Sequence, residues 1–382
     1  MPSLPPFPVT TVGSWPRTPE LIRATKRKAP ELEAMRDEAC LASLRVQEAA
    51  GVDIVTDGEQ RRDNFFSFLS ERVEGFDCMS MADLLDHVED KAGFEALLQT
   101  LDVPAYSIRN NVAVGKLRAI KPLVFDDFLF LRKHTDKPIK VTLPGPYLLT
   151  RSAWVQSLSS ATYPTREELG DDVVKLLRAE LIQLAEAGCE VVQFDEPALT
   201  ELSFAGKSNT HTFMCAALAA NADPEGELNY AVELMNRLVE GVTGTLKSMH
   251  VCRGNWSRDE GVLLSGSYDE LIPYFARMNL DMFVLEYATE RAGDPALLKG
   301  LPSSAHVGFG VVNPRTDEIE DPVAIARRVR ALCEDLGHER VQLNPDCGFG
   351  TFAERPMNTA EVARKKLEAL AQASRLLRSG EI

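Results

Sequence analysis

The sequence predicts an α/β fold, specifically a (β/α)8 TIM barrel in which eight parallel strands alternate with helices. Eight short runs rich in β-branched residues recur along the chain, and most are apolar on both faces, as strands covered by helices are. Longer segments with helical periodicity lie between these runs. Eight strand–helix units favour a closed barrel, and an open doubly wound sheet is the alternative.

The expected elements follow one another in a regular order. We expect strands at 8–14, 52–58, 139–145, 190–196, 246–252, 282–288, 306–312 and 341–347. The two clearest helices are expected at 165–188 and 321–337, and each ends at a glycine, a common helix stop. A helix, a glycine and then a buried strand is the order typical of a parallel sheet.

One segment, at about 60–138, is longer than a single crossover between strands requires. It contains RNNVAVGKLRAI (109–120), which is typical of a β-hairpin or a small excursion from the barrel. No stretch rich in Gly, Ser or Pro divides the chain. We therefore expect one catalytic barrel domain over 1–382, with an insertion after the second strand.

Composition excludes several classes of partner. The net charge of −15 argues against a nucleic-acid phosphate surface. No apolar run approaches the roughly 18 residues that a membrane helix needs. The N-terminus lacks the basic and apolar regions of a secretion signal. The seven cysteines are scattered and odd in number, which argues against a disulfide framework and favours a reducing cytoplasm.

Metal-binding side chains lie at the ends of several expected strands. His250 and Cys252 are two residues apart, so they point to the same side of a strand. Glu286 and Cys347 end two other strands, and in a barrel all these ends open onto the active face. A histidine, a glutamate and two cysteines form a ligand set suited to Zn²⁺. The alternative is that the cysteines pack as small buried hydrophobes.

Carboxylates at other strand ends suggest substrate contacts. Asp195 and Glu196 are adjacent, so they point to opposite faces and are expected to have different roles. One would bind a substrate ammonium, while the other is held by an internal arginine or by backbone N–H groups. Glu59 lies beside Arg61 and Arg62, so a structural ion pair competes with a role in binding.

The chain resembles the cobalamin-independent methionine synthase family, in its C-terminal catalytic zinc barrel, over nearly its whole length. The motifs that carry the resemblance are TTVGSWPRT (10–18), TDGEQRRDN (56–64), TLPGPYLL (142–149), QFDEPAL (193–199), HVC (250–252), LEYATERAG (285–293) and NPDCGF (344–349). Their order along the chain makes them specific together.

The resemblance implies roles for individual residues. The zinc ligands of the family match His250, Cys252, Glu286 and Cys347. Its homocysteine-binding residues match Gly13, Ser14, Glu59 and Asp195, of which Glu59 and Asp195 would hold the substrate ammonium. Trp154 matches the aromatic residue that stacks on a folate pterin.

The implied activity is zinc-dependent methyl transfer to homocysteine, forming methionine. The implied donor is 5-methyltetrahydrofolate or another methyl donor, with a corrinoid protein among the partners considered. Two features depart from the full-length enzymes of the family. The chain has no second, N-terminal barrel, so it is similar to single-barrel "core" relatives. Asn313 stands where the family places a proton-donating histidine, which puts folate as the leaving group in question.

Two other functions are compatible with the sequence. A zinc thiol alkyltransferase could use another thiol or electrophile, as epoxyalkane:coenzyme M transferases do. Arg253 and Arg315 would then bind the sulfonate of such an acceptor, whereas Asp195 and Glu59 suit an amino acid. A non-catalytic barrel with a closed structural zinc site and a docking surface is the alternative from a different class.

Overall fold

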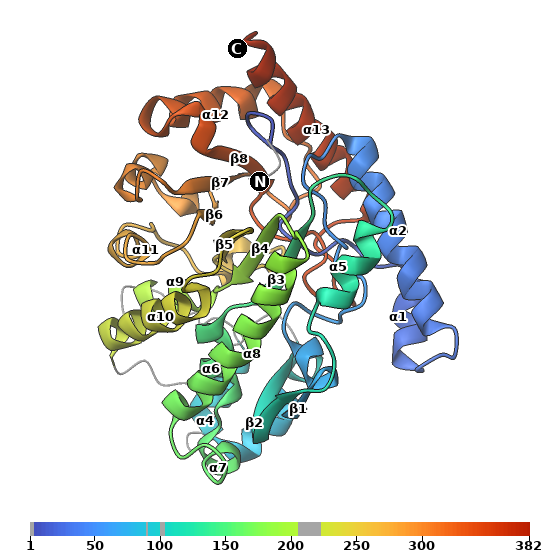
Figure 1. Ribbon diagram of the computed structural model, residues 1–382, viewed down its shortest axis with the longest axis vertical. Coiled ribbons are helices and arrows are strands. Elements are labelled where there is room, and N and C mark those ends of the chain that lie inside the picture. The colour runs from blue at the N-terminus through green and yellow to red at the C-terminus, as the bar shows by residue number, and fades with distance from the viewer. Residues whose placement is uncertain (1–3, 89–90, 100–103, 205–222) are drawn as a thin grey trace.

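A six-stranded parallel sheet forms the centre of the computed structural model, which describes residues 4–88, 91–99, 104–204 and 223–382 (Figure 1). Its strands lie in chain order: β3 (Lys140–Pro144), β4 (Val191–Asp195), β5 (Leu246–Val251), β6 (Met282–Glu286), β7 (His306–Val312) and β8 (Val341–Pro345). Each lies within one of the last six expected strands, and the predicted α/β class is confirmed.

The first two expected strands contribute single parallel bridges instead of a ladder. Val9 pairs with Leu343 of β8, Thr10 pairs with Ile54, and Val55 pairs with Ile139 just before β3. These pairings connect the two edges of the six-stranded sheet. A regular ladder does not extend further here partly because the Val9 backbone N–H donates to the carboxylate of Asp53, at 2.9 Å, rather than to a neighbouring strand.

Long helices surround the sheet (Figure 1). The expected helices at 165–188 and 321–337 are α8 (Arg166–Glu186) and α12 (Pro322–Leu336). Thr165 and Asp321 cap their first turns, and Gly337 follows α12 with φ 90°. The other helices are α1 (Pro19–Lys26), α2 (Leu32–Ala50), α3 (Met81–Leu84), α4 (Lys91–Gln99), α5 (Phe125–Arg132), α6 (Pro146–Ala153), α7 (Gln156–Ser159), α9 (Ala198–Phe204), α10 (Pro224–Val239), α11 (Ile272–Phe275) and α13 (Ala360–Ser379).

The segment after the second expected strand contains a separate antiparallel pair. β1 (Val73–Ser80) pairs with β2 (Arg109–Ala119), and β2 lies against α6, α7 and α8 (Figure 1). The stretch 109–120 therefore contains one strand and is not a hairpin in itself, because its partner strand is the earlier segment Val73–Ser80. The boundaries of the single domain with its insertion stay a prediction.

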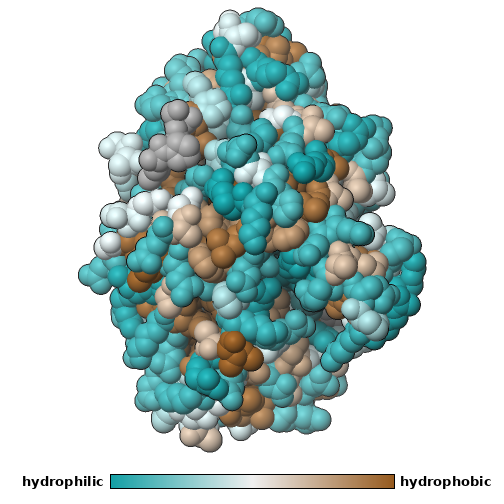
Figure 2. Space-filling model, turned by 45° about the vertical axis from the view of Figure 1, so that its right-hand side comes forward, coloured by the Kyte–Doolittle hydropathy of each residue, from teal (hydrophilic) through white to brown (hydrophobic). Residues whose placement is uncertain are grey.

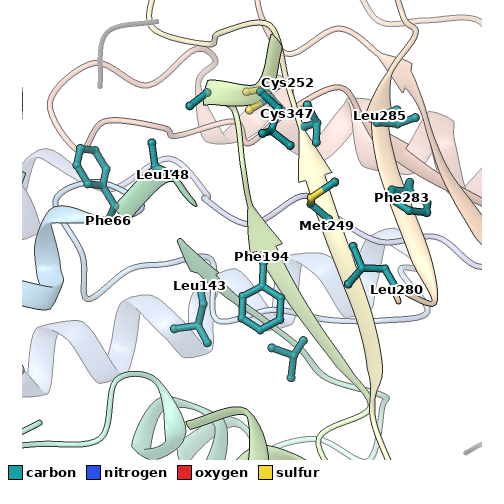
Figure 3. Close-up of a cluster of buried hydrophobic side chains, with 14 of the residues drawn as sticks. Phe66, Leu143, Leu148, Phe194, Met249, Cys252, Leu280, Phe283, Leu285 and Cys347 are labelled. Carbon is teal, nitrogen blue, oxygen red and sulfur yellow. The ribbon is translucent and has the colours of Figure 1, made fainter. Parts of the chain in front are cut away.

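Side chains alternate between the two faces of the sheet. Outward residues such as Phe194 and Met249 join the large core beneath the helices (Figure 3). Inward residues at the amino ends of the strands, among them Val191 and Leu246, form a small apolar cluster with Val12 from the opposite side of the ring. Further along β4 and β5 the inward positions are polar, which places a buried polar layer above this cluster.

The surface gives no sign of a membrane span. Within the described ranges, no helix is both long and apolar enough to cross a bilayer. The face shown in Figure 2 is mainly hydrophilic, with hydrophobic residues in small separate groups.

Candidate active site

Three of the four predicted metal ligands meet at the carboxyl ends of β5 and β8. The side-chain ligand atoms of His250, Cys252 and Cys347 all lie within 4.8 Å of one another, and all three residues are buried. The sulfur atoms of the two cysteines are side by side in Figure 3. Val251, between the first two ligands, packs into the outer core, so the i, i+2 spacing brings His250 and Cys252 to the same side.

His250 is oriented by two hydrogen-bond partners. Its Nδ1 lies 3.1 Å from Asp195 Oδ1, and its Nε2 lies 3.3 Å from the backbone oxygen of Asp346. Burial lowers the pKa of His250, but the hydrogen bond with Asp195 and the neighbouring negative charges outweigh it and raise this pKa to about 9. A carboxylate on one ring nitrogen is the usual arrangement behind a metal-binding histidine.

The two cysteines shift each other's pKa in opposite directions. A hydrogen bond from the Cys347 thiol is the main cause that lowers the pKa of Cys252, and the same bond raises the pKa of Cys347. One thiolate beside one thiol is the expected state of such a buried pair, because two adjacent negative charges repel each other.

Glu286, the fourth predicted ligand, is held by arginines. It is the last residue of β6 and is buried. Its Oε1 lies 3.3 Å from Arg315 Nη1, and its Oε2 lies 3.3 Å from Arg291 Nη2 and 3.9 Å from Arg253 Nη1. Burial raises the pKa of Glu286, but the three guanidinium groups outweigh this effect and lower it. Glu286 is not part of the three-residue cluster in the part of the chain that the structure describes.

A cavity with about 520 Å³ of empty space, which includes space open to solvent, adjoins the His–Cys–Cys cluster. The predicted substrate residues Gly13, Ser14, Glu59 and Asp195 all line it. The other described lining residues are Val12, Phe65, Pro197, His250, Cys252, Asn255, Trp256, Cys347, Gly348, Thr351 and Phe352. No lysine or arginine is among the described lining residues, so the ionisable groups that line the cavity there are Glu59, Asp195, His250 and the two cysteines.

Glu59 has a buried carboxylate oxygen that is available to a ligand. Thr142 Oγ1 donates to Glu59 Oε1 at 2.9 Å, whereas Glu59 Oε2 has no hydrogen-bond partner within the described ranges. Arg62 Nη1 is 4.0 Å from Oε1, so the expected ion pair is a long contact. Burial is the main cause that raises the pKa of Glu59. Its backbone has φ 53°, a left-handed conformation that non-glycine residues rarely adopt.

The two adjacent carboxylates at the carboxyl end of β4, Asp195 and Glu196, make different contacts. Asp195 Oδ1 accepts hydrogen bonds from Gln193 Nε2, at 2.9 Å, and from His250, and the residue lines the cavity. Glu196 instead accepts from the backbone N–H groups of Tyr147 and Leu148, at 2.7 and 2.9 Å, in the first turn of α6. Glu196 is thus held by backbone N–H groups, and Asp195 is the carboxylate that faces the cavity.

Trp154 and Asn313 do not lie where the resemblance led us to expect functional side chains. Trp154 donates its indole N–H to the backbone oxygen of Tyr163 at 3.0 Å and is not among the described residues that line the cavity. The side-chain amide of Asn313 donates to Glu260 Oε1 at 2.8 Å and accepts from the Arg315 backbone N–H at 3.0 Å.

The two arginines that could bind a sulfonate acceptor serve internal contacts. Arg253 donates to the backbone oxygens of Gly266, Glu286 and Ala292, and its guanidinium lies 3.8 Å from the ring centroid of Tyr268. Arg315 bridges Glu286 and Asp346. Both arginines are fully buried, and neither is among the described lining residues. This arrangement does not support the sulfonate alternative.

Comparison with protein families agrees with the geometry. The model of the family described as "Cobalamin-independent synthase, Catalytic domain" matches residues 7–222 and 260–374. The methionine synthase of Thermococcus kodakarensis is 30% identical and covers 92% of this chain and 89% of its own length. That of Sulfurisphaera tokodaii is 27% identical and covers 99% of this chain and 94% of its own. A family that is cobalamin-independent does not support the corrinoid-protein donor considered from the sequence.

Solved structures show the same fold. A B12-independent methionine synthase from Shewanella sp. W3-18-1, in complex with selenomethionine, matches with a TM-score of 0.72 and 23% identity over 99% of both chains. A putative vitamin-B12-independent methionine synthase from Listeria monocytogenes matches with a TM-score of 0.68 and 22% identity over 98% of both chains.

Proposed function

Because the chain belongs to the family of the cobalamin-independent synthase catalytic domain, we propose that it transfers a methyl group to the thiol of homocysteine, forming methionine. The observation that supports homocysteine as the acceptor is that Oε2 of buried Glu59 has no hydrogen-bond partner within the described ranges. With Asp195 on the same cavity, it offers two carboxylates to one ammonium group. The absence of lysine and arginine from the described lining favours an amino acid over a sulfonate.

The metal of this site is proposed to be Zn²⁺. One imidazole and two thiol groups, all within 4.8 Å of one another, form a donor set that fits Zn²⁺. His250, Cys252 and Cys347 would hold the ion, and we propose Glu286, whose negative charge acts on the pKa values of His250 and Cys252, as the fourth ligand. When bound, Zn²⁺ would lower the pKa of a substrate thiol and so supply a thiolate nucleophile at neutral pH.

The side chains around the cavity would orient the acceptor. Glu59 and Asp195 would bind its ammonium group from two sides. The hydroxyl and backbone N–H of Ser14, which donate no hydrogen bond within the described ranges, would bind its carboxylate. Asp195 also accepts from His250 Nδ1, so one residue couples the amino group of the acceptor to the metal ligand. Holding the thiol in line with the methyl donor would supply most of the protein's contribution to the rate.

For the donor we propose 5-methyltetrahydrofolate. The methyl group would pass from its N5 to the homocysteine sulfur, and N5 would take up one proton, which balances the proton lost by the thiol, so that tetrahydrofolate leaves. The aromatic lining residues Phe65, Trp256 and Phe352 give the cavity flat apolar walls suited to a heterocycle. We also propose that both the acceptor and the donor are small molecules and that the protein acts in the cytoplasm.

The test is methionine formation by the purified, metal-loaded protein. We expect methionine, measured by mass spectrometry, when homocysteine and 5-methyltetrahydrofolate are both present. The matched variant Cys347→Ser should lose bound metal and activity while its circular dichroism spectrum is unchanged. If methionine formed only from a different methyl donor, the proposed donor would be wrong and the proposed acceptor would stand. Full activity in Cys347→Ser would contradict the assigned metal site.

A further inference from the structure

A fully buried lysine lies inside the ring of strands, below the cavity. Lys140, the first residue of β3, is 2% exposed. Its ammonium group donates to the backbone oxygen of Thr11 and, at 3.0 Å, to Gln193 Oε1. Neither Lys140 nor Gln193 lines the cavity, and neither has a role in the function proposed above. Burying a charged lysine costs free energy unless the charge is paired and hydrogen-bonded, so the burial of Lys140 needs an explanation.

The position of Gln193 between Lys140 and Asp195 fixes the orientation of its amide. An ammonium group has only donors and a carboxylate has only acceptors. The amide oxygen of Gln193 must therefore face Lys140, and the amide nitrogen must face Asp195, as found. Gln193 Nε2 donates to Asp195 Oδ1 at 2.9 Å and to the backbone oxygen of Val12 at 3.1 Å.

The consequence for Asp195 is that its two oxygens are no longer equivalent. Oδ1 accepts from Gln193 and from His250, so its hydrogen-bonding capacity is used inside the protein. Oδ2 is left as the oxygen available to the cavity that Asp195 lines. The same lysine and glutamine also hold the carbonyl groups of Thr11 and Val12, directly before Gly13 and Ser14.

We propose that Lys140 and Gln193 form a relay of positioning residues that aims Asp195 at the amino group of the acceptor and so determines selectivity for an amino-acid thiol. The inference rests on the proposed function, because it takes homocysteine as the acceptor. The relay acts on one carboxylate in two ways: Asp195 Oδ2 would bind the ammonium group, and Asp195 Oδ1 lies behind His250.

Electrostatics agree with this role. Burial lowers the pKa of Lys140 to about 7, and the negative charges of Asp195 and Glu59 oppose that decrease. At pH 6.5 the ammonium form that orients Gln193 is favoured, so the relay is best tested there.

The experiment measures binding of homocysteine to metal-loaded protein by calorimetry at pH 6.5, without a methyl donor. Lys140→Met and Gln193→Met should each raise the Kd by about tenfold, as expected for the loss of one charge-assisted hydrogen bond. The double variant should be no weaker than either single variant, because both changes break one relay. Binding of 4-mercaptobutanoate, which lacks the amino group, should be unchanged in all three.

Gln193→Glu provides a variant that keeps a partner for Lys140 and so is expected to fold. It replaces the donor that faces Asp195 by an acceptor, and we expect a Kd for homocysteine raised by tenfold or more. Lys366→Met is the matched control. Lys366 is also buried, but it belongs to helix α13 and pairs with Glu320. This variant should leave both Kd values unchanged.

Two results would overturn the relay while leaving the proposed function intact. One is an unchanged Kd for homocysteine in Gln193→Glu. The other is a double variant whose loss is the product of the two single losses, which would mean independent effects. A wild-type protein that does not bind homocysteine would overturn the acceptor itself, and the relay with it.

Discussion

At the scale of single residues, the site depends on close contacts that only small side chains permit. Gly13 lies against the carboxylate of Glu59, and a Cβ atom built on it would come within 2.2 Å of Glu59 Oε1. The glycine is therefore required for the position of Glu59, not for an unusual backbone angle. Gly13 was expected to contact the substrate, and the structure gives it this additional reason.

Gly13→Ala is predicted to move the Glu59 carboxylate out of the cavity. We expect the KM for homocysteine to rise at least tenfold, because a charge-assisted contact to the ammonium group is lost. Bound metal should stay at the wild-type level, since the contact is not part of the His–Cys–Cys cluster. Steady-state kinetics together with metal analysis measure both quantities.

Gly115→Ala is the matched control for this substitution. Gly115 lies in β2, and a Cβ atom there would meet its nearest neighbour at an ordinary 3.5 Å. Its KM should equal that of the wild type. A Gly13→Ala enzyme with a wild-type KM would show that Glu59 does not bind the acceptor.

At the scale of elements, the loop after β7 joins the ends of two strands. Arg315 Nη1 lies 3.3 Å from Glu286 at the end of β6, and Arg315 Nη2 lies 3.0 Å from Asp346 just after β8. Burial raises the pKa of Asp346 to about 6, against the lowering effect of Arg315. Through Arg315, the loop thus places one positive charge between two buried carboxylates.

Arg315→Met is predicted to lower the free energy of unfolding by about 3–5 kcal/mol, because it removes the arginine that pairs with buried Asp346 and leaves buried Glu286 with two of its three arginines. Urea denaturation measures the change. Arg258→Met is the control, since Arg258 pairs with Asp317 on the surface, where both side chains are about half exposed. That change should cost less than about 1 kcal/mol. Equal losses in the two variants would contradict a supporting role for the buried cluster.

The elements show where sequence patterns are informative. Strands β3 to β8 could be predicted because continuous apolar runs are typical of strands buried on both faces. The proximity of three of the four proposed metal ligands could be predicted because strand ends in this class of fold meet at one face. The lengths of the first two strands were overestimated, because apolar character does not reveal that the Val9 backbone N–H donates to a side chain.

The partners of the site residues could not be predicted. Lys140 is far in sequence from Thr11 and Gln193, as Arg253 and Arg315 are from Glu286, and no local pattern distinguishes these residues from surface charges. Arg253 and Arg315 were considered as acceptor-binding residues for this reason, although both are buried in internal contacts.

At the scale of the whole molecule, the space inside the ring of paired strands contains two layers. An apolar cluster fills the amino end of the ring interior, and buried polar groups with the metal cluster occupy its carboxyl end. Apart from Cys252 and Cys347, the outer core beneath the helices consists of side chains that are not proposed to bind the metal, so the fold is expected to persist when the metal is removed. Such persistence would distinguish a catalytic site from a structural zinc site.

The most direct test of methyl transfer through this site is X-ray absorption at the zinc edge. Two cysteine sulfurs should coordinate zinc in the resting protein, from Cys252 and Cys347. Addition of homocysteine should raise the number of sulfur ligands from two to three, as its thiolate binds. An unchanged sulfur count in the presence of saturating homocysteine would contradict thiol activation at this site.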